Sequence, residues 1–213
     1  MKCDKKMMLL YAVTDRQWVG KLSLYEQVEA ALKGGVTCIQ LREKQLNGDD
    51  FLKEAIQIKE LCKQYQVPFI INDNVEVAIQ CNADGIHVGQ DDLDAIQVRQ
   101  RVGKDMMIGV SVHSVEEALD ALKAGADYLG VGSMFSTSTK LDVDILPIET
   151  LKAICDAVNI PVVAIGGLNK NNIHMLKHSG VDGVALVSAI FKADDIEEET
   201  RILYHLSLEM VNA

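Results

Sequence analysis

The sequence predicts an α/β protein, a (β/α)8 barrel (TIM barrel) that takes up residues 1–213 as one domain. Three observations predict it: short apolar runs, helical patterns between them, and a repeated junction at which a helix ends and a strand begins. With 213 residues the chain lies near the lower size limit of this fold, roughly 200 residues. Its apolar content of 48% is sufficient for one large core.

Eight apolar runs are expected to be the strands. Most are rich in β-branched residues and apolar on both faces, as strands of a buried parallel sheet are. The runs cover residues 8–13, 38–41, 69–71, 86–88, 107–112, 128–131, 162–165 and 184–187.

The segments between these runs carry helical patterns. Residues 23–35, "SLYEQVEAALKGG", begin with a serine that can cap a helix, continue with apolar residues at helical spacing and end with glycine. Segments 49–66, 114–125 and 169–180 show the same pattern, and a last helix is expected over residues 196–210.

A quasi-repeat marks the junctions between helix and strand. The stretches "KGGVTCIQL", "CNADGIHVG", "KAGADYLGV" and "HSGVDGVAL" each end a helix with Gly or Asn and then begin a strand. A doubly wound open sheet is the alternative, and it would usually carry a glycine-rich phosphate turn after the first strand. The first strand here continues as "AVTDRQW", which favours the barrel.

Charge and cysteine usage restrict the function classes. A net charge of −10 disfavours nonspecific nucleic-acid binding, and an anionic small molecule would need local cations or a metal ion. The five scattered cysteines are typical of reduced thiols in a cytoplasmic protein. No apolar run has the length of a signal peptide core or a membrane span. We therefore expect a cytoplasmic protein that acts on small molecules; a homo-oligomer is compatible with the sequence.

Carboxylates follow two consecutive strands. A barrel places its active site at the C-terminal ends of its strands. Asp73 and Asp92 lie just after the third and fourth runs, so they could share a Mg²⁺ ion, which prefers oxygen ligands. Capping of the following helices is the alternative. Zinc is not expected, because no His/Cys cluster has ligand spacing.

Cations and glycines follow other strands. Arg42 and Lys44 alternate along an extended segment and suit phosphate binding; a surface salt bridge with Glu43 or a neighbour is the weaker alternative. Gly166 and Gly167 allow a ligand to approach the backbone after the seventh strand, where many barrels bind phosphate, or they form only a tight turn. His87 is either a hydrogen-bonded residue of the barrel interior or a catalytic group.

Six stretches in this order resemble the thiamine phosphate synthase family: "LYAVTD", "IQLREK", "FIINDNVEVAIQCNADGIHVGQDD", "GVSVHS", "TSTK" and "VAIGGL". The resemblance covers residues 9–191 and implies a (β/α)8 barrel. It also implies a Mg²⁺-dependent transferase of thiamine biosynthesis. That enzyme joins 4-amino-2-methyl-5-(diphosphooxymethyl)pyrimidine to 4-methyl-5-(2-phosphooxyethyl)thiazole, giving thiamine phosphate and pyrophosphate.

The resemblance also implies residue roles. It assigns Mg²⁺ to Asp73 and Asp92, and catalysis to Arg42, Lys44, Ser111 and Lys140. It implies a pyrimidine diphosphate site formed by Gln40, Leu41, Arg42, Glu43, Lys44, Asn72, Ser111 and Lys140. It implies a thiazole phosphate site formed by Thr137, Ser138, Thr139, Gly167, Val187 and Ser188.

One departure and two rival functions accompany the resemblance. The family commonly has prolines where "GSMFSTSTK" has Ser133 and Ser136. A thiazole tautomerase-like isomerase on the same barrel is one rival, and a non-catalytic ligand-binding barrel is the other. The intact "QLREK", "ND" and "TSTK" favour the synthase over the isomerase, and the two serines keep the non-catalytic barrel as an alternative.

Overall fold

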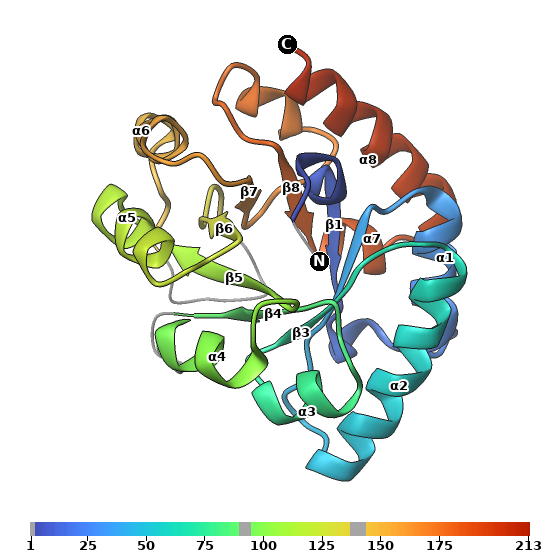
Figure 1. Ribbon diagram of the computed structural model, residues 1–213. Helices are drawn as coiled ribbons and strands as arrows, with labels where there is room; N and C mark the ends of the chain where they lie inside the picture. Colours follow the sequence, from blue (N-terminus) through green and yellow to red (C-terminus); the bar gives the residue numbers. More distant parts are fainter. Residues whose placement is uncertain (1–2, 90–94, 137–143) are drawn as a thin grey trace.

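The computed structural model describes residues 3–89, 95–136 and 144–213. Eight parallel strands of this part close into a barrel in sequence order, β1 to β8, with β8 paired to β1 (Figure 1). This confirms the predicted (β/α)8 fold. The strands are β1 (Leu10–Val13), β2 (Cys38–Leu41), β3 (Phe69–Asn72), β4 (Gly85–Val88), β5 (Met107–Val112), β6 (Tyr128–Val131), β7 (Val162–Ile165) and β8 (Gly183–Leu186).

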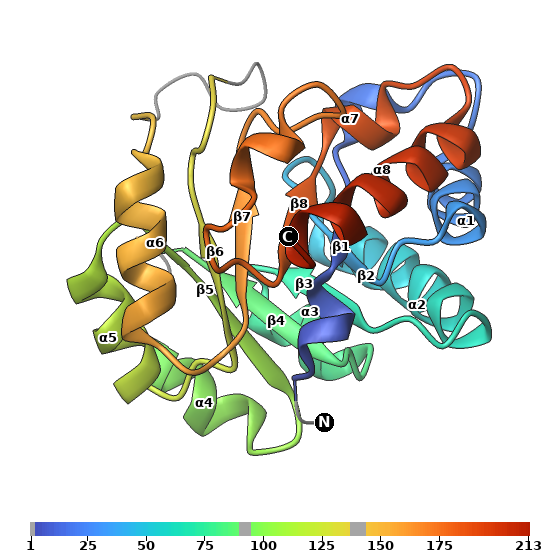
Figure 2. The same ribbon diagram turned by 90° about the horizontal axis from the view of Figure 1, so that it is seen from above.

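Helices surround the barrel on the outside. The first of them begins at a capping box, in which Ser23 and Glu26 each accept a backbone N–H of the other, and ends before Gly35 with φ of 102°. Figure 2 shows α7, which follows β8, at the opposite end of the barrel from the N-terminus. The described helices are α1 (Leu24–Gly34), α2 (Gly48–Gln64), α3 (Val75–Gln80), α4 (Ala95–Val102), α5 (Val115–Lys123), α6 (Ile148–Ala157), α7 (Ser188–Phe191) and α8 (Ile196–Val211), with 3₁₀ turns η1 (Lys5–Met8), η2 (Arg16–Trp18) and η3 (Ile173–Leu176).

The repeated junctions connect neighbouring strands at the N-terminal end of the barrel. The backbone N–H of Asp127 donates to the carbonyl of Ile108 at 2.7 Å, and its carboxylate accepts the N–H of Ile108 at 2.8 Å. These bonds satisfy the first backbone groups of a strand, which would otherwise be left without partners. The same paired bonds join Asp84 to Phe69 and Asp182 to Val162.

The apolar core has two parts, inside and outside the barrel wall. The interior is filled by a small cluster that includes Met8, Ile70, Met107 and the rings of Tyr11 and Tyr128. A larger cluster packs the outward-facing strand residues against the helices. Strands with apolar residues on both faces are needed for this arrangement, which is why the runs showed no polar alternation.

The prediction of a helix over residues 169–180 was wrong. Only the 3₁₀ turn η3 forms there. Asn169 and Asn172 both donate from their side-chain amides to the carbonyl of Gly167, at 3.2 and 3.0 Å. The side-chain oxygen of Asn172 also accepts the backbone N–H of Asn169. Such local bonds compete with helical ones, so the segment forms a compact turn after β7.

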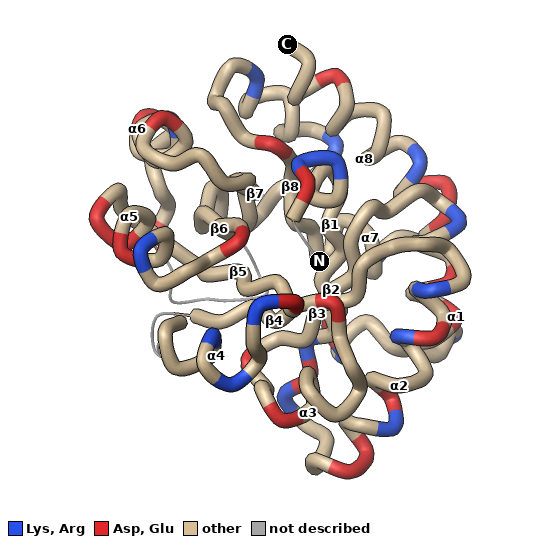
Figure 3. Tube along the Cα trace, in the orientation of Figure 1, with Lys and Arg blue, Asp and Glu red and all other residues tan. Residues whose placement is uncertain are grey.

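The outer surface carries interleaved acidic and basic residues, most visibly along α1, α2 and α5 (Figure 3). Within the described ranges, no helix is both long enough and apolar enough to cross a membrane.

The thiols are expected to be poorly reactive in the folded protein. All five cysteines are free: Cys38, Cys62 and Cys81 are buried, and Cys3 and Cys155 are partly buried. Burial raises the pKa of the Cys62 thiol to about 12 and that of the Cys81 thiol to about 11, so the reactive thiolate is scarce at pH 8. We expect labelling by a disulfide reagent at pH 8 to be slow in buffer and complete for all five thiols in denaturant. Fast labelling of Cys62 in buffer would contradict this.

Candidate active site

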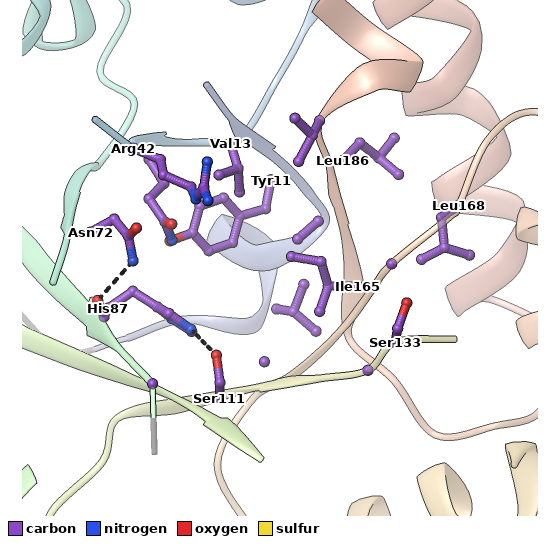
Figure 4. Close-up of a pocket in the computed structure, with 18 of the residues that line it drawn as sticks. Tyr11, Val13, Arg42, Asn72, His87, Ser111, Ser133, Ile165, Leu168 and Leu186 are labelled. Carbon is purple, nitrogen blue, oxygen red and sulfur yellow. Dashed lines mark hydrogen bonds between the residues drawn. The ribbon is translucent and has the colours of Figure 1, made fainter. Parts of the chain in front are cut away.

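A cavity of about 450 Å³ opens at the C-terminal end of the barrel, and every strand contributes to its wall (Figure 4). This is the end at which barrel enzymes bind their substrates. Of the residues proposed from the sequence, those that line it are Gln40, Arg42, Lys44, Asn72, Asp73, Ser111, Gly167, Val187 and Ser188.

A chain of hydrogen-bonded side chains forms the floor of the cavity. Gln40 donates from its amide to the hydroxyl of Tyr11 at 2.7 Å, and that hydroxyl lies 2.8 Å from the hydroxyl of Tyr128. His87 continues the chain, with Nδ1 3.1 Å from the Tyr128 hydroxyl. Its Nε2 lies 2.9 Å from Ser111 Oγ (Figure 4). His87 and Ser111, which are partly exposed, present polar groups to the cavity, and the phenols of Tyr11 and Tyr128, 2% and 0% exposed, lie buried beneath them. Polar groups fixed in this way suit a heterocyclic ligand with ring nitrogens.

Burial keeps the two phenols neutral. Desolvation raises the pKa of Tyr11 and of Tyr128 well above the usual range. Both hydroxyls remain protonated at any physiological pH, so each can donate as well as accept a hydrogen bond.

Glycines in β5 and β6 make room for this floor. A Cβ on Gly109 would overlap the Tyr128 ring and lie 2.5 Å from His87 Nδ1, and one on Gly130 would lie 3.0 Å from the same imidazole. The sequence reasoning missed the tyrosines and these glycines. Glycine within an otherwise β-branched strand was the available signal, because it marks a close approach of another group.

The two cations of the "QLREK" stretch line the cavity but pair with different carboxylates. Arg42 Nη1 lies 3.4 Å from Asp15 Oδ2, after β1, and Lys44 Nζ lies 2.5 Å from Asp73 Oδ2, after β3. Both the phosphate-binding interpretation and the ion-pair alternative thus fit the structure. An incoming anion would find these cations in place but would have to compete with the carboxylates.

Leu41 and Glu43 of that stretch face elsewhere. Leu41 is completely buried in the cluster between the strands and the helices. Glu43 turns its carboxylate toward Arg16, and its side chain is 1% exposed. Neither is among the residues that line the cavity.

Asp73 lines the cavity, and both of its carboxylate oxygens accept hydrogen bonds. Its φ of 61° lies in the left-handed region, which aspartate tolerates better than most residues. Its Oδ1 accepts from the side chain of Asn72 at 2.7 Å, and Oδ2 faces Lys44. The helix-capping alternative does not apply to this residue, because Asn74 caps α3.

The donor set around Asp73 fits Mg²⁺. It offers hard oxygen atoms, and a cationic group, the Lys44 ammonium, already lies against the carboxylate. No group of three or more His, Cys, Asp or Glu side chains in the described part of the chain could hold a metal ion by itself. An ion here would take further ligands from the substrate or from water, as Mg²⁺ commonly does.

The opposite wall of the cavity is backbone-rich. Gly166 and Gly167 have φ of 101° and 63°, conformations that favour glycine. A Cβ on Gly167 would lie 2.7 Å from the carbonyl oxygen of Phe135, so the turn packs directly on the segment after β6. Val187 and Ser188, at the start of α7, line the same side.

Five of the proposed residues lie outside the described residues: Asp92, Thr137, Ser138, Thr139 and Lys140. Of the two serines found in place of family prolines, Ser133 donates from its hydroxyl to the carbonyl of Phe135 at 2.9 Å. This bond closes the short turn that faces Gly166 and Gly167.

Comparison with known proteins gives the family. The model of a family described as thiamine monophosphate synthase matches residues 10–190, which is most of the barrel. The chain belongs to the thiamine monophosphate synthase family. This confirms the resemblance found in the sequence.

Individual members of the family cover nearly the whole chain. The thiamine-phosphate synthase of Clostridium acetobutylicum is 46% identical over 197 residues, which are 92% of this chain and 93% of that protein. That of Ruminiclostridium cellulolyticum is 49% identical over 92% of this chain and 94% of its own. A solved structure, thiamine phosphate pyrophosphorylase from Pyrococcus furiosus, superposes with a TM-score of 0.90 at 37% identity, covering 97% of this chain and 98% of that one.

Proposed function

We propose that the cavity joins a pyrimidine methyl diphosphate to a thiazole phosphate and releases pyrophosphate, which is the thiamine phosphate synthase reaction. One observation carries the proposal. A cation–carboxylate cluster after β2 and β3 faces a glycine turn after β7 across a hydrogen-bonding aromatic floor, within a single cavity. Two anionic groups could bind at these two walls, with the heterocycles that carry them meeting over the floor. Membership of the family supports this assignment.

The proposed reaction is a substitution at the pyrimidine methylene carbon. The bond from this carbon to the diphosphate oxygen breaks, and its electron pair leaves with the diphosphate. The lone pair of the thiazole nitrogen then forms the new carbon–nitrogen bond. The protein's tasks are to position the reactants and to stabilise the negative charge that develops on the leaving group.

In this proposal each part of the cavity has one task. The floor from Gln40 to Ser111 holds the aminopyrimidine by contact with the face of the pyrimidine ring and by hydrogen bonds to its ring nitrogens. Arg42 and Lys44, together with Lys140 outside the described residues, neutralise the leaving diphosphate, and Ser111 hydrogen-bonds to it. No acid–base pair is required, which agrees with the neutral tyrosines of the floor.

We further propose that Asp73 holds Mg²⁺ beside the diphosphate, with Asp92 as a second carboxylate ligand. When bound, the ion would offset charge on the diphosphate oxygens. Asp73 would then hold the metal ion in place of the Lys44 ammonium, and Lys44 would be free to contact the diphosphate. The second substrate's phosphate is proposed to bind against Gly167, Val187 and Ser188, and also to Thr137, Ser138 and Thr139, which lie outside the described residues. The free thiols support a reducing compartment, so we place the protein in the cytoplasm.

The direct test is a pyrophosphate-release assay with the purified protein. We expect release only when both substrates and Mg²⁺ are present, with thiamine phosphate formed in equal amount. A tautomerase would convert its thiazole substrate without releasing pyrophosphate, and a non-catalytic barrel would bind ligands without turnover. Either outcome would contradict the proposal.

A further inference from the structure

Glu43 is folded back onto its own segment. Its Oε1 accepts the backbone N–H groups of Lys44 at 2.8 Å, Gln45 at 2.6 Å and Leu46 at 3.3 Å. One carboxylate oxygen therefore fixes three consecutive peptide groups of a loop that has no other regular structure. Hydrogen bonds to a charged acceptor are about twice as strong as neutral ones.

Arg16, in the 3₁₀ turn after β1, holds the other oxygen of this carboxylate. Its Nε donates to Glu43 Oε2 at 2.6 Å, and its Nη2 donates to Glu54 Oε2, on α2, also at 2.6 Å. The guanidinium thus bridges the β2 loop to the helix that follows it. The Glu43 side chain is 1% exposed and that of Glu54 is 20% exposed, so both carboxylates are largely removed from water.

The segment fixed in this way carries the two cations of the cavity. Arg42 and Lys44 are the immediate neighbours of Glu43, and both line the cavity while Glu43 points away from it. Their side chains are 30% and 53% exposed, so packing alone restrains them weakly. A loop without the Glu43 bonds would let these cations move away from the bound diphosphate.

We propose that Glu43 and Arg16 are positioning residues that hold Arg42 and Lys44 against the diphosphate; the role of the diphosphate rests on the function proposed above. Glu43 was expected from the family resemblance to contact the pyrimidine diphosphate. Its carboxylate is instead occupied by three N–H donors and a guanidinium, and a carboxylate facing the diphosphate would repel it. The resemblance to the family assigns no role to Arg16.

The test compares Glu43→Ala, Glu43→Gln and Arg16→Met with the unsubstituted protein. We expect Glu43→Ala to raise the KM for the pyrimidine diphosphate roughly tenfold, the equivalent of one lost charge-assisted hydrogen bond. The KM for the thiazole phosphate should stay within about twofold, because that site lies on the opposite wall. Glu43→Gln should recover part of the loss, since an amide oxygen still accepts the three N–H groups whereas the amide NH2 cannot accept from Arg16. Arg16→Met, which keeps the three N–H bonds, should also lose less than Glu43→Ala.

A binding readout accompanies the kinetics. Calorimetry with pyrophosphate and Mg²⁺ should show the same ranking of affinities: highest for the unsubstituted protein, intermediate for Glu43→Gln and Arg16→Met, and lowest for Glu43→Ala. This measurement does not depend on turnover. If the unsubstituted protein makes no thiamine phosphate but the order of pyrophosphate affinities holds, the proposed function fails while the positioning role stands.

Arg99→Met is the matched control. Arg99 lies 2.5 Å from Asp127, whose carboxylate also caps a backbone N–H, but at the N-terminal end of the barrel. This variant should lower the thermal midpoint and leave both KM values unchanged. The positioning role is overturned if Glu43→Ala behaves like Arg99→Met, losing stability alone. It is also overturned if Glu43→Gln loses as much pyrophosphate affinity as Glu43→Ala. The loss would then come from removing the negative charge and not from releasing the loop.

Discussion

Asp73→Asn is expected to reduce kcat by roughly 10²–10³-fold, the loss typical of removing one group that stabilises transition-state charge. The substitution removes the charge that pairs with Lys44 at 2.5 Å and that we assign to Mg²⁺. Asparagine tolerates the left-handed backbone at this position, where φ is 61°, whereas alanine would add strain. The fold should therefore persist, and turnover at saturating substrate is the measurement.

A second readout separates the metal role from a general charge effect. Titration of Mg²⁺ in the presence of pyrophosphate should show weaker metal binding in Asp73→Asn. Asp120→Asn is the control, because Asp120 pairs with Lys123 on the exposed face of α5 and lies outside the cavity. Near-normal turnover of Asp73→Asn at limiting Mg²⁺ would remove Asp73 from the metal site.

Gly167→Ala is expected to raise the KM for the thiazole phosphate by roughly tenfold or more, with a much smaller effect on the pyrimidine diphosphate. The added Cβ would lie 2.7 Å from the carbonyl oxygen of Phe135 and closer still to that of Ser136, so the turn and the facing backbone must move apart. These contacts are with backbone atoms, which cannot rotate away as a side chain does. Steady-state kinetics with each substrate varied in turn measures the effect.

Gly103→Ala isolates the contribution of backbone strain. Gly103 also has a positive φ, 75°, but a Cβ there meets nothing within 4 Å. It should lose stability without a change in either KM.

Arg42→Ala is the reciprocal variant and should weaken binding of the pyrimidine diphosphate much more than binding of the thiazole phosphate. If Gly167→Ala and Arg42→Ala weaken both substrates equally, the two phosphate groups do not occupy the separate walls that we propose.

Much of the barrel could be predicted from local sequence. Residues 38–41, 107–112, 128–131 and 162–165 were predicted as strands with the bounds that the structure has. The reason is physical: a strand covered on both faces must be apolar throughout, so its ends show as the first polar residues. The helix predicted over 169–180 failed because asparagine side chains replaced the helical bonds there.

The sequence by itself determined that this chain forms a barrel, which polar residues end its strands, and the family to which it belongs. Only the tertiary structure decided how those polar residues are used. Tyr11 and Tyr128 meet across 117 residues of chain, and Arg16 reaches Glu43 and Glu54 from a different loop. Periodicity and spacing describe neighbours along the chain. Contacts between strand ends arise only when the barrel closes. The alternation that separates Arg42 and Lys44 from Glu43 therefore could not show that Glu43 meets Arg16 or that Lys44 meets Asp73.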